Sequence, residues 1–226
     1  MLNRKLLGLL CVLVATSPAA HAVSYGFQNI TRNSAANAAA GEAQLFMDVT
    51  DAGSGRVSFV FTNLGPAASS ITDVYFDDGT LLGISSVING PGVNFSEGAA
   101  PKDLPGRNNI DPRFRTTKDF SADSNPPTQP NGVNPGERLE LITELINGRT
   151  FADTIAALAA GGVDGGLRVG IHVQGFANGG SESFVNGRAL PPPPPPGPVV
   201  PEPSSALLAA IAFGMVGGSL RRRSRG

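Results

Sequence analysis

The chain has 226 residues with a formal net charge of −1, and it contains 29 glycines, 19 prolines, one cysteine and no tryptophan. So much glycine and proline excludes a helical bundle or a coiled coil, whereas a hydrophobic content of 41% excludes general disorder. The balanced charge argues against a nucleic-acid-binding protein, and one cysteine cannot build a disulfide framework within the chain.

The N-terminus has the three parts of a secretory signal peptide, which we assign to residues 1–22. A positively charged start is followed by apolar residues 6–15, and Ala20 and Ala22 supply small residues at the −3 and −1 positions of a cleavage site. We expect signal peptidase to cut after Ala22, because the apolar stretch is short for a membrane anchor. The only cysteine, Cys11, lies in this stretch, so the mature chain contains none.

Residues 23–190 are long enough for one extracytoplasmic domain with its own core. The alternation in residues 56–62 places Val57, Phe59 and Phe61 on one face and predicts a strand. Such strands, with one apolar and one polar face, are expected to be half-buried in an antiparallel sheet.

Two β-hairpins are predicted further along the chain. Residues 71–76 and 81–87 flank an Asp-Asp-Gly-Thr turn, in which Asp-Gly tolerates the positive φ of a tight hairpin. Residues 167–173 and 181–185 flank a glycine-rich turn and form the second hairpin.

The remaining segments are less regular. Residues 101–135 contain seven prolines and are predicted as a long surface loop or an irregular insertion. Residues 138–146 fit both a strand and a helix, and the strand is favoured. One short helix is predicted after Thr150, which forms a capping box with Asp153, and two glycines at 161–162 end it.

These elements together predict a mainly β domain. The expected fold is an antiparallel β-sandwich of jelly-roll or immunoglobulin-like type with one short helix, and a partly open barrel is the alternative. Behind the domain, residues 191–199 begin with six consecutive prolines, which force polyproline II and predict a stiff stalk.

The C-terminal segment has three parts in a fixed order. Pro201, Glu202 and Pro203 come first, and the uncharged residues 204–220 follow. As a helix these 17 residues span roughly 25 Å, slightly less than the ~30 Å hydrocarbon core of a bilayer, and we predict a transmembrane helix. The chain then ends with a basic cluster formed by Arg221, Arg222, Arg223 and Arg225. Basic residues stay on the cytoplasmic side, which leaves the domain outside the membrane.

The tripeptide, the apolar stretch and the arginine cluster of residues 200–226 resemble the PEP-CTERM sorting signal of Gram-negative bacteria. The alternative is a plain C-terminal membrane anchor that follows a proline-rich spacer. The resemblance implies export, anchoring in the inner membrane, and cleavage near residues 201–203 by exosortase, a membrane-embedded cysteine enzyme. It also implies delivery to the cell envelope or to an exopolysaccharide or biofilm matrix. In that scheme the chain is the substrate, and the catalytic residues belong to the sorting enzyme.

Three acidic residues, Asp73, Asp77 and Asp78, are the best candidate for a metal site, because calcium prefers several converging carboxylate oxygens. Turn chemistry also accounts for Asp77 and Asp78, and the solvent face of a strand accounts for Asp73. The spacing of an EF-hand loop is absent.

Other candidate residues lack a convergent set. His172 falls on the polar face of its strand, beside Arg168 and Gln174, and is predicted to be a solvated or hydrogen-bonded surface side chain. The glycine-rich residues 161–166 follow a helix and precede a strand, the reverse of a nucleotide-binding loop, and are interpreted as a connector.

We therefore predict a non-enzymatic, exported surface or matrix protein without catalytic residues or an obligatory cofactor. The alternatives are a carbohydrate- or calcium-binding module and an extracellular hydrolase that uses paired carboxylates. The expected partners are signal peptidase, exosortase, the inner membrane and exopolysaccharide, and no nucleic acid is expected.

Overall fold

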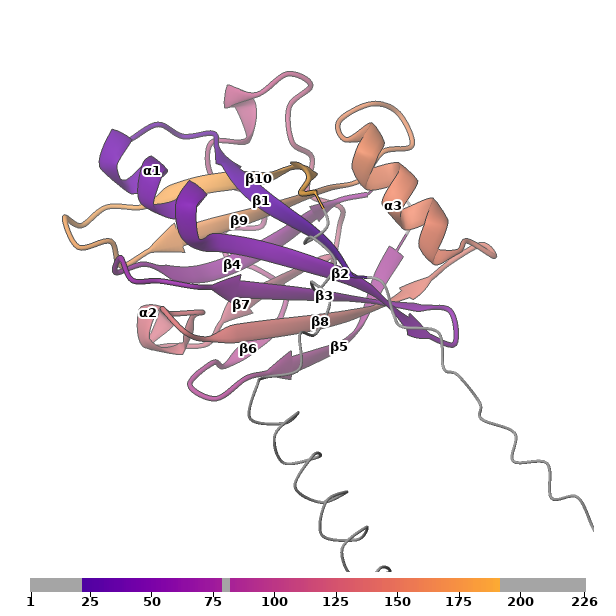
Figure 1. Ribbon diagram of the computed structural model, residues 1–226, viewed down its shortest axis with the longest axis horizontal. Helices are drawn as coiled ribbons and strands as arrows, with labels where there is room; N and C mark the ends of the chain where they lie inside the picture. The colour runs from indigo at the N-terminus through magenta and orange to yellow at the C-terminus, as the bar shows by residue number, and fades with distance from the viewer. Residues whose placement is uncertain (1–21, 79–81, 192–226) are drawn as a thin grey trace, which may run out of the picture. The chain divides into compact units, whose positions relative to one another are not determined.

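The computed structural model describes residues 22–78 and 82–191 (Figure 1). The predicted signal peptide up to residue 21, the stalk from residue 192, the sorting tripeptide, the apolar segment and the arginine cluster lie outside the described residues. Within the described ranges, none of the helices is long and apolar enough to cross a membrane.

The described chain is mainly β. Its strands are β1 (Val23–Asn29), β2 (Leu45–Gly53), β3 (Arg56–Asn63), β4 (Ser70–Asp77), β5 (Leu82–Asn89), β6 (Phe95–Glu97), β7 (Ser121–Ser124), β8 (Arg138–Leu145), β9 (Arg168–Gln174) and β10 (Glu182–Ala189). Its helices are α1 (Ala35–Gln44), α2 (Thr128–Asn131), α3 (Phe151–Ala160) and the 3-10 turn η1 (Arg107–Asn109).

All these strands belong to one antiparallel sheet with the order β5-β8-β3-β2-β1-β10-β9-β4-β7-β6. The two outermost strands, β5 and β6, follow each other in the chain. The Asn89 side chain joins them, because its Nδ2 donates to the Phe95 carbonyl (3.1 Å) and its Oδ1 accepts from the Phe95 amide (2.7 Å). The sheet is therefore barrel-like and nearly closed. The antiparallel β architecture is confirmed, and the finer assignment to a sandwich stays a prediction.

The enclosed side of the sheet holds the main apolar core. Val57, Phe59 and Phe61 of β3 are fully buried, as the alternation predicts. Phe76 of β4 contacts Phe59 edge-on (centroids 5.2 Å apart) and stacks on Phe120 (4.0 Å). Aromatic contacts thus link strands that lie on opposite sides of the core.

One predicted hairpin is confirmed and the other is wrong. β9 and β10 pair directly, with Val173 opposite Glu182. β4, however, pairs with β9 and β7, whereas β5 pairs with β8. The reason is burial: every residue of β4 except the last is buried, and distant strands supply the neighbours on both of its edges.

The helix predictions have a mixed outcome. Residues 138–145 form a strand, and α3 begins with the predicted capping box between Thr150 and Asp153. Helix α1 was not predicted, although Ser34 caps it and an alanine-rich run follows. A Cβ atom at Gly41 of α1 would lie 2.2 Å from the Phe184 ring, so glycine permits the helix to approach the sheet closely.

Residues 101–135, predicted as a surface loop or an irregular insertion, contain the short elements η1, β7 and α2, and they are not confined to the surface. We call residues 98–120 the cover segment. Leu104 and Phe114 of this segment pack on Tyr75 and Val185, on the outer side of β4 and β10. Gly170 of β9 gives them room, because a Cβ atom there would lie 2.6 Å from Leu104. The cover segment therefore buries a sheet face that was expected to be solvated.

Candidate functional site

The carboxyl groups of Asp73 and Asp123 lie on neighbouring strands next to the cover segment. Asp73 of β4 is opposite Asp123 of β7 in the sheet, and it is only 2% exposed. Its carboxylate accepts from the Thr72 hydroxyl (2.8 Å), and the Tyr75 hydroxyl lies 3.3 Å from its Oδ1 and 2.9 Å from the Pro101 carbonyl oxygen. The Tyr75 side chain therefore links Asp73 to the cover segment.

The pKa of Asp73 is raised from 3.8 to about 7, mainly by burial and to a smaller extent by the negative charge of Asp123, while hydrogen bonds from Thr72 and Tyr75 oppose the rise. Burial also raises the pKa of Asp123. Protonation of one member of this pair removes the repulsion between two adjacent carboxylates. The pair supplies the two carboxyl groups that a hydrolase with paired carboxylates needs. A substrate could contact Asp73 only if the cover segment moved.

His172 is 9% exposed, so the expectation of a solvated surface side chain is wrong. It is hydrogen-bonded, because its Nδ1 lies 3.1 Å from the Ser183 hydroxyl oxygen. Burial lowers the pKa of His172, while the negative charge of Glu182 opposes this effect. The side chain is on the outer face of β9, opposite Asp73, where residues distant in sequence exclude water.

Glu182 connects β10 to the start of α1. It accepts hydrogen bonds from the Asn29 side chain (2.9 Å), the Thr31 hydroxyl, and the Asn33 (3.2 Å) and Ser34 (2.6 Å) amides. Burial by itself raises the pKa of Glu182, but the hydrogen bonds from Thr31, Asn29, Ser34 and Asn33 outweigh burial and lower it. Glu182 is therefore an ionised structural anchor. No local sequence signal marks it, because its partners are about 150 residues away in the chain.

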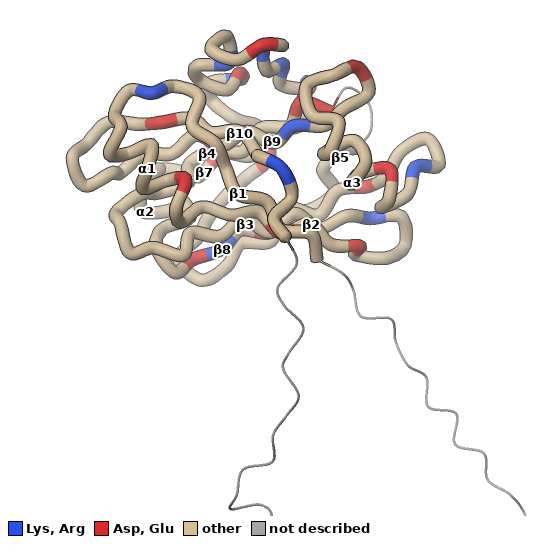
Figure 2. The backbone as a smooth tube through the Cα atoms, turned by 45° about the horizontal axis from the view of Figure 1, so that its top comes forward, with Lys and Arg blue, Asp and Glu red and all other residues tan. Residues whose placement is uncertain are grey.

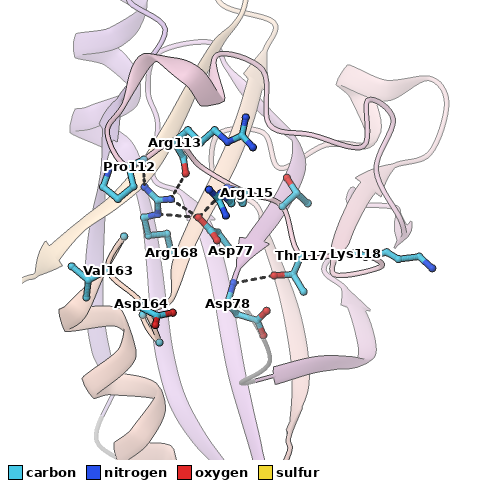
Figure 3. Close-up of a pocket in the computed structure, with 15 residues that line it drawn as sticks. Asp77, Asp78, Pro112, Arg113, Arg115, Thr117, Lys118, Val163, Asp164 and Arg168 are labelled. Atoms are coloured by element: carbon cyan, nitrogen blue, oxygen red, sulfur yellow. Dashed lines mark hydrogen bonds and ion pairs between the residues drawn. The ribbon is translucent and has the colours of Figure 1, made fainter.

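A pocket of about 650 Å³ opens where β4 ends and β9 begins (Figure 3). We call it the groove. One wall is formed by residues 112–118 of the cover segment, and the other by the glycine-rich residues 161–166 between α3 and β9. The order of helix, loop and strand agrees with the interpretation of residues 161–166 as a connector.

Arg168 lies at the base of the groove and fastens the first wall. Its Nε donates to Asp77 Oδ2 (3.1 Å), and its Nη2 makes an ion pair with the same oxygen. Its Nη1 donates to the Pro112 carbonyl (2.7 Å), and its Nη2 also donates to the Arg113 carbonyl (2.8 Å). The guanidinium carbon lies 5.3 Å from the centre of the Phe114 ring, a cation–π contact.

The structure does not bring the three predicted calcium ligands together. Asp73 and Asp77 are four residues apart on one strand, which separates their α-carbons by roughly 13 Å. Asp77 is paired with Arg168, and the Asp78 amide donates to the Thr117 hydroxyl (3.1 Å). Among the described residues, no group of three or more His, Cys, Asp or Glu side chains could hold a metal ion. Calcium binding at these residues stays a prediction.

The sequence reading missed the exposed cations of the groove, Arg113, Arg115 and Lys118. Phe114, which lies between the two arginines, is fully buried. The alternation of charged and apolar residues was the available signal. The surrounding prolines instead favoured a surface loop or an irregular insertion, with no partner for these cations.

A second pocket of about 960 Å³ lies between α3 and the strands β1 and β10. Ile155 and Leu158 contribute apolar surface to it, and Asn186 and Arg188 contribute polar groups. It shares Arg168 with the groove, so the two pockets lie on either side of this side chain.

The molecule thus combines an acidic, cysteine-free β domain with an apolar C-terminal segment that ends in arginines. This combination defines a protein addressed to a membrane by its C-terminus. Residues 199–223 match the family model of the PEP-CTERM protein-sorting motif, which confirms the resemblance seen in the sequence. The chain is therefore an exported protein with a C-terminal sorting signal for exosortase. The match leaves the β domain uncovered, and no curated protein and no solved structure matches the chain.

Proposed function

We propose that this protein is a non-enzymatic component of the cell envelope or extracellular matrix, which exosortase releases from the inner membrane. The observation that carries the proposal is the sorting motif at residues 199–223, which follows an exported domain and a predicted signal peptide. In this scheme the β domain is the part that acts outside the cell, and the two ends only direct it there.

The geometry of the acidic and basic side chains supports a role without catalysis. Asp73 of the carboxyl pair is covered, and the ring of His172 is buried. Asp77, the acid at the base of the groove, is neutralised by Arg168. These groups make their hydrogen bonds within the protein.

Sorting can be tested by expressing the full chain in a Gram-negative host with an exosortase and in the same host without it. We expect a shortened protein in the envelope or medium of the first strain, and a protein with an uncut C-terminus in the inner membrane of the second. A variant that lacks residues 204–226 should be exported but not retained in the inner membrane. Identical mass and location in both strains would contradict the proposal.

A carbohydrate-binding role is the second candidate, and the groove favours it. The groove is open, has charged and backbone polar groups on both walls, and contains about 650 Å³ of space. A role of this kind is compatible with sorting, because a matrix protein needs a surface that binds a matrix polymer.

A further inference from the structure

The two arginines of the cover-segment wall project from a backbone that is held in place. Arg168 holds this backbone through the carbonyls of Pro112 and Arg113. In addition, the Arg115 amide donates to Asp77 Oδ2 (3.0 Å), and the Thr117 amide donates to the Phe76 carbonyl (2.7 Å). Phe114 is fully buried, and its amide donates to the Arg107 carbonyl (3.0 Å). The Arg113 and Arg115 side chains are exposed, so a fixed wall carries two accessible positive charges.

Within residues 22–78 and 82–191, no ion pair includes these two charges. Among the residues that the structure describes, the ion pairs are Arg107 with Asp103, Lys118 with Asp119, and Arg168 with Asp77. Lys118 lies 3.7 Å from Asp119, but both side chains are almost fully exposed and the pair is weak. Arg113 and Arg115 are therefore available to an external anion.

The opposite wall offers different chemistry. Val163 is 61% exposed at the tip of the loop, and Asp164 beside it is also exposed (Figure 3). The carboxylate of Asp164 and the loop carbonyls accept hydrogen bonds, whereas the arginines donate them. A ligand that suits both walls carries hydroxyl donors and anionic groups together.

We propose that the groove binds an anionic polysaccharide, whose carboxylate or sulfate groups pair with Arg113 and Arg115 while its hydroxyl groups donate to Asp164 and the adjacent loop. An arginine guanidinium matches a carboxylate or sulfate through two parallel hydrogen bonds. The proposal rests on the proposed extracytoplasmic role for access to such a polymer.

A polysaccharide fits better than a nucleic acid. Residues 23–190 contain 11 basic and 17 acidic residues, a net charge of −6, and Figure 2 shows both signs interspersed over the domain. A long, uniformly charged phosphate backbone would be repelled outside the groove. A polymer that enters the groove with one or two anionic sugars avoids most of that repulsion.

The test uses the full chain, purified in detergent from cells without exosortase, so that every protein retains the same terminal arginines. Polygalacturonate, dextran sulfate, neutral dextran and duplex DNA are immobilised, and binding is measured at low salt. The variant Arg113→Gln/Arg115→Gln is compared with Arg56→Gln/Arg149→Gln, which removes the same charge from exposed positions outside the groove. The melting temperature of each protein checks that it is folded.

We expect binding to polygalacturonate or dextran sulfate, and the preferred polymer identifies carboxylate or sulfate as the ligand group. Affinity should fall at least about tenfold in the groove variant and less than about twofold in the control. Equal loss in both variants, equal binding to neutral dextran, or equal binding to DNA would overturn the inference. A protein that binds but is not processed would contradict the sorting proposal alone, and a processed protein that does not bind would contradict only this inference.

Discussion

The domain and the two ends of this chain carry opposite charge. Residues 23–190 have a net charge of −6, whereas the residues outside them have a net charge of +5, which nearly cancel in the total of −1. The charges of the ends are neighbours in the sequence, as in the arginines at 221–223. In the domain, by contrast, the fold brings distant charges together: Arg168 and Asp77 form an ion pair although they are 91 residues apart. The ends thus carry charge that is local in sequence, whereas in the domain distant charges meet to hold the fold and shape its groove.

The largest effect is expected at the basic end. Replacement of Arg221, Arg222, Arg223 and Arg225 by glutamine removes the charge that we predict to keep this end cytoplasmic. We expect most of the protein to be lost from the inner membrane in cells without exosortase, as measured by membrane fractionation. The Arg56→Gln/Arg149→Gln variant serves as the control, and it should fractionate like the wild type. Unchanged membrane retention of the terminal variant would show that the C-terminal arginines contribute no more to retention than arginines of the domain.

A smaller effect, a loss of domain stability, is expected when the ion pair between Arg168 and Asp77 is broken. Arg168→Met removes the cation that pairs with Asp77, whose side chain is only 19% exposed, and the donor to the carbonyls of Pro112 and Arg113. The free energy of unfolding in urea should fall by about 2 kcal/mol. The double variant Asp77→Asn/Arg168→Met should recover part of this loss, because it removes the unpaired charge. Full stability of the single variant would contradict the role of Arg168 in holding the cover segment on the sheet.

A third effect, of similar size but confined to part of the pH range, concerns Asp73. Its pKa is about 7 in the folded protein and near 3.8 when unfolded, so the folded state holds the proton between these values and the unfolded state does not. The contribution to stability is therefore greatest at pH 4 and is lost as pH rises toward 7. Asp73→Asn should remove this dependence and stabilise the domain by about 2 kcal/mol at pH 8.

Thermal unfolding of wild type and Asp73→Asn from pH 4 to pH 8 checks this expectation. Glu182 and His172 have lowered pKa values, and each of them reduces stability as pH falls. Both contributions are present in the two proteins, so the difference between the curves reports the carboxyl pair of Asp73 and Asp123. Parallel curves at all pH values would contradict the raised pKa of the buried carboxyl group.

The sequence predicts a structural element well when residues close to it in the chain determine that element, and poorly when distant residues do. The β3 strand, the β9–β10 hairpin and the Thr150 capping box were predicted, because alternation, turn residues and cap spacing act over a few residues. The β4–β5 hairpin failed because β4 finds both of its neighbours elsewhere in the chain. The burial of His172 and the groove wall were missed for the same reason: His172 lies beside Asp73 and Ser183 of neighbouring strands, and residues 112–118 come back to the ends of β4 and β9.

We propose that the two ends direct the domain to its location and are then removed by processing. Intact mass spectrometry of the protein recovered from its native cells tests this proposal. We expect the mass of a chain that begins at Val23 and ends near Pro201, Glu202 or Pro203, together with any group attached during sorting. A protein that retains residues 204–226 at its final location would contradict it.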